Sequence, residues 1–228
     1  MSDMLPIFNT LEKEKQDILI KHLELVMDAN DRVNLTRITN MDEGMLLHVE
    51  DSLSALEEIE RAPIGEMADL GSGAGFPGIP LAIASGRKTT LVDARKKKMD
   101  EVSSIIEKLG QDSLINTFAG RAELLARKNG QRYSLITARA LSQISVLLEL
   151  ASPLLIQGGH LVCYKAKVED AELEHADEVG RLTGMQLLSD RSFVLGGEYT
   201  RRVLVYVKSE KQKIALPRLE GQAQKNPL

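Results

Sequence analysis

Short apolar runs alternate with amphipathic stretches between residues 67 and 164, and this alternation constrains the fold more than any other feature of the chain. Strands separated by helix-length segments form right-handed β-α-β units and a parallel sheet. After a charged helix at Glu169–Thr183, two further runs flank Gly196-Gly197 and predict an antiparallel hairpin. The pattern therefore predicts an α/β fold with a mostly parallel sheet. The expected strands are Met67–Leu70, Thr89–Asp93, Leu114–Phe118, Leu135–Thr137, His160–Tyr164, Leu187–Val194 and Arg202–Lys208, and the expected helices between the parallel strands are Ile79–Ser85, Lys96–Lys108, Arg121–Arg127 and Ser142–Leu150.

The first 64 residues have a helical pattern instead. Apolar residues recur at helical spacing from Leu11 to Val26, with Asn9 or Thr10 as the expected cap, and Asn30-Asp31 predicts the end of this helix. A second helix is expected from Asp42 to Ile59. It places His48, Asp51 and Ser52 on one stripe, because residues three and four apart are neighbours on a helix. We therefore expect a helical extension at 1–64, a sheet domain at 65–208, and a basic tail at 209–228 that is polar and mobile at its end.

Composition excludes several classes of protein. The chain has 228 residues, of which 43% are apolar and 27% charged, so collagen, a disulfide scaffold and wholesale disorder are excluded. The single cysteine, Cys163, lies in an apolar run and predicts a buried side chain. The four histidines and this cysteine have no ligand spacing, so no metal site is expected. No apolar run approaches the length of a membrane span, and we expect a cytoplasmic protein.

Charge is distributed unevenly along the chain. The net charge is −4, but residues 1–64 carry −8 and residues 65–228 carry +4. The basic residues include the run Arg95-Lys96-Lys97-Lys98 and the pair Arg201-Arg202. Such clusters are solvated faces in many proteins, and they are also the typical footprint of an anionic partner such as RNA.

The segment Asp69–Gly78 follows the first strand of the predicted sheet and opens its first helix. The sequence DLGSGAGFPG fits two patterns there. Gly73, Gly75 and Gly78 match a dinucleotide fingerprint, whereas Asp69 with Gly71, Gly73 and Gly75 places an acid at the strand end before three alternate glycines. The second pattern is favoured, because the fingerprint glycine would lie too far beyond the strand for a pyrophosphate and Pro77 removes an N–H donor.

A cofactor without phosphate, carrying ammonium and sulfonium charges, fits the second pattern. S-adenosylmethionine (SAM) is such a molecule, and Asp69 is expected to attract its positive charge. Asp93 follows Gly71 by 22 residues at the end of the second strand, where a carboxylate is able to accept from both ribose hydroxyls. The sequence therefore predicts a Rossmann-like SAM-binding sheet.

Motifs along almost the whole chain resemble one family, the small-subunit ribosomal RNA guanine-N7 methyltransferases called RsmG, formerly glucose-inhibited division protein B. Their order is specific although no single motif is unique. The chain departs from the family pattern at Lys96–Met99 and at Leu216-Pro217. The motifs are Asn34-Leu35-Thr36, His48-x-x-Asp51-Ser52, the segment Asp69–Leu81, Asp93, Arg121-x-Glu123, Ala138-Arg139-Ala140, Tyr164-Lys165-Ala166 and the closing Pro217-Arg218-x-x-Gly221 with Lys225-x-Pro227-Leu228.

The resemblance implies SAM-dependent methylation of guanine N7 in 16S ribosomal RNA of the small ribosomal subunit. No obligate protein partner is evident in the sequence, and we expect a monomer. It implies SAM contacts at Gly71, Phe76, Arg139 and the Ala122-Glu123 backbone, with Phe76 covering the methionine end. It places His48 and Asp51 beside the pocket for the methyl acceptor. The alternative that His48 and Asp51 are a hydrogen-bonded pair with a purely structural role remains open. The full set of candidates is, for the cofactor, Asp69, Gly71, Gly73, Gly75, Phe76, Asp93, Ala122, Glu123 and Arg139; for acceptor positioning, Arg139, Lys165, Asp51 and His48; and for RNA, Asn34, Arg95, Lys96, Lys97, Lys98, Lys165, Arg201 and Arg202.

The chemistry of guanine N7 requires no general base, because this nitrogen has a free lone pair and no proton. An arginine on the N7 edge would block the reaction, so we expect Asp51 to read the opposite edge, where N1–H and the amine are donors. Three alternatives remain open: a SAM-dependent enzyme with another RNA, small-molecule or protein acceptor, a non-catalytic SAM-binding module for RNA or a partner, and a nicotinamide oxidoreductase. The last lacks a recognisable proton donor.

Overall fold

The computed structural model describes residues 4–228 and is built on one seven-stranded sheet, with the strand order β3-β2-β1-β4-β5-β7-β6. Strands β1 to β5 run parallel, and β7 is antiparallel to both β5 and β6. The predicted α/β sheet with a C-terminal hairpin is confirmed; the first three residues of the predicted helical extension lie outside the described residues. The strands are β1 (Met67–Leu70), β2 (Thr89–Asp93), β3 (Ile115–Ala119), β4 (Tyr133–Arg139), β5 (Leu155–Lys165), β6 (Met185–Leu195) and β7 (Tyr199–Lys208).

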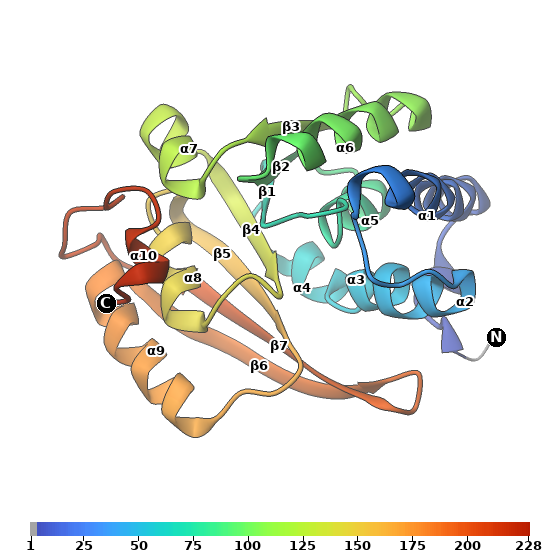
Figure 1. Cartoon of the computed structure of the whole chain (residues 1–228). Helices are drawn as coiled ribbons and strands as arrows, with labels where there is room; N and C mark the ends of the chain where they lie inside the picture. The colour runs from blue at the N-terminus through green and yellow to red at the C-terminus, as the bar shows by residue number, and fades with distance from the viewer. Residues whose placement is uncertain (1–3) are drawn as a thin grey trace.

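Helices cover both faces of this sheet (Figure 1). One face packs against α5 (Gly78–Ser85) and α6 (Lys96–Leu109), and the other against α7 (Ala122–Asn129), α8 (Ile144–Ala151) and α9 (Asp170–Thr183). Because both faces are covered, the central strands β1 and β2 are buried along their whole length. The carboxyl ends of β1, β2, β4 and β5 are left as the edge where polar side chains collect.

The first helix, α1 (Lys13–Val33), shares a core with the sheet domain. Leu19, Leu23 and Val26 are fully buried and belong to the same cluster as the apolar side chains of α5 and α6. The predicted end at Asn30-Asp31 was wrong: the helix continues to Val33 and ends at Asn34, whose backbone is left-handed and donates to the Asn30 carbonyl. The expected cap at Asn9 or Thr10 was also wrong, because both residues lie in the preceding 3-10 helix η2 (Phe8–Thr10).

The predicted single helix over 42–59 is divided into four pieces. Asn40 caps the first by accepting from the Asp42 and Glu43 amides. A π-helical segment then carries His48, and a turn at Ser54-Ala55 ends the third piece. This broken path places Asp51 and His48 against the carboxyl end of β4, and Asp51 also against the amino end of the antiparallel strand β7. The pieces are α2 (Met41–Gly44), η3 (Met45–Glu50), α3 (Asp51–Leu53) and α4 (Leu56–Arg61).

The C-terminal tail packs against the sheet domain and ends in the short helix α10 (Gln222–Lys225). Ala223 is 1% exposed and belongs to the core cluster that contains α8. The segment therefore has an apolar anchor that its composition conceals, and the mobility of its end stays a prediction.

Candidate active site

The loop between β1 and α5 is braced by Asp69. Its two carboxylate oxygens accept from the Gly78 amide at 3.0 Å and from the Thr137 hydroxyl at 2.8 Å, and the side chain is fully buried. Burial raises the pKa of this carboxyl to about 7, and its two hydrogen bonds oppose the rise. Asp69 thus fastens the loop to the sheet, and the expected role as an attractor of the cofactor's positive charge is not what its contacts support.

Two glycines of this loop are required by close approach. Gly71 has a left-handed backbone, and a Cβ there would lie 2.7 Å from a Leu141 methyl carbon. At Gly78 a Cβ would lie 2.3 Å from a Leu91 methyl carbon. Gly73 and Gly75 also have left-handed backbones, and the Gly73 amide donates to Asp93 at 3.3 Å. The alternate glycines therefore let the chain turn tightly between β1, β2 and the loop after β4.

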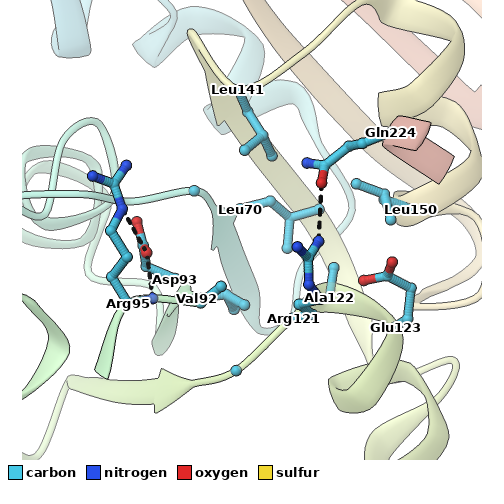
Figure 2. Close-up of a pocket in the computed structure, with 13 residues that line it drawn as sticks. Leu70, Val92, Asp93, Arg95, Arg121, Ala122, Glu123, Leu141, Leu150 and Gln224 are labelled. Carbon is cyan, nitrogen blue, oxygen red and sulfur yellow. Dashed lines mark hydrogen bonds and ion pairs between the residues drawn. The ribbon is translucent and has the colours of Figure 1, made fainter. Parts of the chain in front are cut away.

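A pocket opens at the carboxyl ends of β1, β2 and β3 (Figure 2). It encloses about 590 Å³ of space, including its open mouth. Asp93 lies on one side, where one oxygen accepts from the Arg95 amide at 2.8 Å and the other faces Gly73. The lining residues are Leu70, Gly71, Val92, Asp93, Ala94, Arg95, Gly120, Arg121, Ala122, Glu123, Leu141, Leu150 and Gln224.

This pocket has the composition that an adenosine needs. Apolar side chains offer a surface for the faces of a base, and the Asp93 carboxylate is an acceptor for ribose hydroxyls. Among the nine residues expected to contact SAM, four line this pocket: Gly71, Asp93, Ala122 and Glu123. The Glu123 side chain lines the pocket and also accepts a hydrogen bond from the Gly221 amide of the tail at 2.7 Å.

Phe76 is buried and contacts two histidine rings. The His22 ring centroid lies 4.5 Å from that of Phe76 in a tilted arrangement, and the His48 ring stacks on Phe76 at 4.6 Å. The Arg139 guanidinium carbon lies 5.9 Å from the Phe76 centroid. Phe76 is 5% exposed and does not line the pocket described above. Its contacts indicate a support for His48 and Arg139, in place of the expected cover over the methionine end of the cofactor.

His48 is held as a neutral imidazole. Its Nδ1 faces an Arg139 N–H at 3.4 Å, so Nδ1 accepts and the proton lies on Nε2, which contacts the Thr36 hydroxyl at 2.7 Å. Burial, with the nearby Arg139 charge, lowers the pKa of His48 to about 3. The ring therefore stays uncharged at neutral pH and orients the arginine.

A second, cationic pocket lies at the ends of β4 and β5. It encloses about 1170 Å³, open to solvent, and its lining includes His48, Asp51, Arg139, Tyr164, Lys165 and Arg201. Asp51 bridges two guanidiniums: one oxygen accepts from Arg139 at 2.9 Å and the other from Arg201 at 2.8 Å. The Asp51 side chain is 7% exposed. The expectation that Asp51 reads a guanine edge is therefore revised, since both of its oxygens already hold arginines.

Lys165 is paired in the same pocket. Its ammonium lies 2.7 Å from Glu172 and donates to the Ser142 carbonyl at 3.2 Å. Glu172 also accepts from the Ile144 amide, the first residue of α8. The tyrosine before the lysine, Tyr164, donates its hydroxyl proton to the Ser52 carbonyl at 2.6 Å, which ties α3 to β5.

Three consecutive residues after β4 separate the two pockets. Leu141 lines the first pocket, whereas Ala140 and Ser142 line the second. Ala140 has a left-handed backbone, which is uncommon for a residue with a side chain. Neighbouring residues of this segment therefore face different pockets, which adjoin at the end of β4.

The expected RNA-binding residues have different environments. Lys97 and Lys98 donate to the Arg32 and Leu35 carbonyls at the end of α1, so they stabilise the N-terminal helices. Arg202 is paired with Asp190, and Arg95 lies 3.8 Å from Asp93. Lys96 and Asn34 are exposed.

Sequence reasoning missed Gln224 and Leu141, which have no recognisable chemical signature in the sequence, and it noted Thr36 only within a family motif, without its contact to His48. Within residues 4–228, no three histidine, cysteine or acidic side chains gather as metal ligands. In the same part of the chain, every helix is too short or too polar to cross a membrane.

Known proteins are similar to this chain over most of its length. The model of a family described as rRNA small subunit methyltransferase G matches residues 15–201. Proteins named ribosomal RNA small subunit methyltransferase G are 34% identical in Listeria welshimeri, over 91% of this chain and 88% of theirs, and 33% identical in Carboxydothermus hydrogenoformans, over 96% and 94%.

Solved structures show a similar fold. An O-methyltransferase from Bacillus cereus, solved in complex with SAH, has a TM-score of 0.59 at 18% identity, over 91% of this chain and 94% of that one. A geranyl diphosphate methyltransferase has a TM-score of 0.55 at 10% identity, over 69% and 76%. At these identities the likeness concerns the fold alone, whereas the family model and the relatives cover most of the sequence: the chain belongs to the rRNA small subunit methyltransferase G family.

Proposed function

We propose that this chain transfers a methyl group from SAM to N7 of a guanine in 16S ribosomal RNA of the small ribosomal subunit. Membership of the family supports the reaction and its cofactor. The observation that carries the proposal is the pair of pockets divided by Ala140–Ser142, one suited to adenosine and the other cationic. A methyl donor and a polyanionic acceptor need this kind of arrangement.

The reaction requires positioning rather than proton transfer. Bound SAM supplies a methyl group on a positively charged sulfur. The N7 lone pair forms the new bond as the carbon–sulfur bond breaks, and the positive charge passes from sulfur to the guanine ring. No proton leaves the base, which fits a neutral His48 whose nitrogens are already engaged. The rate then depends on how well the two groups are aligned and how the charge is accommodated.

Arg139 and Lys165 are the residues that orient the acceptor in this proposal. Both end strands of the rigid sheet, and both are held by buried or half-buried anions, Asp51 and Glu172. A fixed cation is a better phosphate ligand than a flexible one, because less side-chain entropy is lost on binding. Asp51 and His48 position Arg139, and Asp51 also positions Arg201.

The RNA is expected to approach over the carboxyl edge of the sheet, with Lys96, Asn34 and Arg201 as contacts. Guanine N7 is hidden in the deep groove of A-form RNA, so the target is an unpaired or splayed nucleotide. We further propose that the protein acts in the cytoplasm as a monomer.

The test uses radiolabelled SAM with small-subunit particles, naked ribosomal RNA or tRNA. Label in ribosomal RNA, followed by strand cleavage at the labelled site after borohydride and aniline, is the expected result, because this treatment cuts at N7-methylguanine. Label only in tRNA, a protein or a small molecule would refute the acceptor, and SAM binding without transfer to any acceptor would refute the enzyme. An Arg139→Ala variant should bind RNA but transfer the methyl group poorly. Its loss of transfer would show that the labelling comes from this protein and not from a contaminating enzyme.

A further inference from the structure

The closing segment 217–228, here called the tail segment, is docked by an ion pair, a backbone hydrogen bond and an apolar contact. Arg218 donates to both oxygens of Glu149 at 2.7 and 2.6 Å, and the Glu149 side chain is 3% exposed. The Gly221 amide donates to Glu123 at 2.7 Å. Ala223 adds an apolar anchor beside α8. Three independent contacts therefore hold this twelve-residue segment on the helices that border the cofactor pocket, although those helices are far from it in the sequence.

This docking brings Gln224 to the rim of the pocket. Its amide oxygen accepts from the Arg121 guanidinium at 2.9 Å. Because a guanidinium only donates, Arg121 selects one orientation of the amide: the oxygen faces the arginine and the NH₂ group faces away from it. Figure 2 shows that nitrogen turned toward the hollow bordered by Leu70 and Leu141.

We propose that Gln224 is a cofactor-binding residue, whose amide N–H donates to a ring nitrogen of the adenine of SAM. The proposal rests on the function proposed above. Adenine carries three ring nitrogens that accept hydrogen bonds, and its faces are apolar, as are Leu70, Leu141 and Leu150 in the lining. A neutral donor beside these leucines suits a neutral base better than a charged group would, because no ion has to lose its water.

The proposal also gives the tail segment a role. Glu123 belongs to the pocket and at the same time holds Gly221, so the wall that contacts the cofactor and the segment that carries Gln224 are one connected unit. Arg218 is then a positioning residue that acts through Gln224.

The first measurement is the affinity for S-adenosylhomocysteine by calorimetry. Gln224→Ala should weaken binding about 3- to 10-fold, the effect of one neutral hydrogen bond. Gln222→Ala is the matched control, since Gln222 belongs to the same short helix and does not line the pocket, and it should bind like the parent. Equal affinity of the Gln224→Ala variant and the parent would overturn the proposal. Failure of the parent to bind would instead refute the proposed function.

The second measurement identifies the hydrogen bond itself. Three analogues of S-adenosylhomocysteine, with N1, N3 or N7 of adenine replaced by a C–H group, are titrated into the parent and into Gln224→Ala. One analogue should bind the parent more weakly than the natural compound and bind the variant without that loss, because the partner is already gone. If all three analogues lose the same factor in parent and variant, Gln224 has no adenine contact and the proposal is wrong.

Discussion

Replacement of Asp51 by asparagine tests whether this carboxylate supports the acceptor pocket or reads the base. Asn keeps the shape of Asp, but it offers one oxygen instead of two and turns an NH₂ group toward the second guanidinium. One of the bonds to Arg139 and Arg201, at 2.9 and 2.8 Å, is therefore lost. A hydrogen bond to a charged group contributes about 1.5–3 kcal/mol. Because the two arginine side chains remain 15% and 19% exposed and regain some water, we expect a loss near the lower end, about 2 kcal/mol.

The assay is equilibrium unfolding in urea together with a thermal melt. A loss of about 2 kcal/mol lowers the melting temperature of a chain of this size by roughly 4–8 °C. Methyl transfer should fall as well, since Arg139 loses its anchor, while the affinity for S-adenosylhomocysteine should change little. Glu60→Gln, at an exposed carboxylate, is the control for the loss of one negative charge. If Asp51→Asn unfolds at the parental urea concentration and still abolishes transfer, the reasoning is refuted, and Asp51 contacts the base directly.

Three further predictions concern the cofactor, pH and RNA. Asp93→Ala should weaken binding of S-adenosylhomocysteine about 10- to 150-fold in calorimetry, because a charge-assisted acceptor for the ribose is lost; unchanged affinity would exclude that role. Burial lowers the pKa of His22 to about 4 and raises that of Asp69 to about 7. As pH falls from 6.5 toward 4, the buried neutral His22 should therefore lower the free energy of unfolding, whereas Asp69 should raise it. The urea midpoint of the Asp69→Asn variant should then fall more steeply with decreasing pH than that of the parent. In filter binding, Lys96→Glu should weaken RNA binding and reduce its dependence on salt, and it should leave the melting temperature unchanged. Lys98→Glu should lower the melting temperature, because Lys98 donates to the Leu35 carbonyl. Equal effects of the two variants on RNA binding and on the melting temperature would contradict these two roles.

The sheet could be predicted because its buried strands are short apolar runs with a clear break on either side. Their lengths were harder to predict. The run His160–Tyr164 marks only part of β5, which begins at Leu155 and includes Gly158-Gly159. Glycines weaken the strand pattern, yet here they accommodate an irregular register between β4 and β5. The N-terminal helices were misjudged for a related reason, since a π-helical segment preserves an apolar stripe while it changes the direction of the side chains around His48.

The location of the site could be predicted from strand ends. Asp93, Arg139 and Lys165 each end a parallel strand, and the carboxyl ends of such strands meet at one edge. The pairing of these side chains could not be predicted. Nothing in the sequence indicates that Asp51 lies between two arginines, one of them 150 residues away, or that Lys165 is paired with Glu172. The sequence indicates which charged residues gather at the candidate site, whereas the fold decides which of them neutralise one another.

The charges of the cationic pocket fit the proposed reaction, which relocates a positive charge. Three cations with low exposure, Arg139, Arg201 and Lys165, are held by two anions, Asp51 and Glu172, which leaves one excess positive charge beside a neutral His48. An RNA nucleotide brings one negative phosphate, so its arrival balances the pocket. Methyl transfer then moves a positive charge from sulfur to guanine without changing the total. Without the two anions, three cations would repel the newly charged base, so we expect Asp51 and Glu172 to serve the proposed reaction as well as to position their partners.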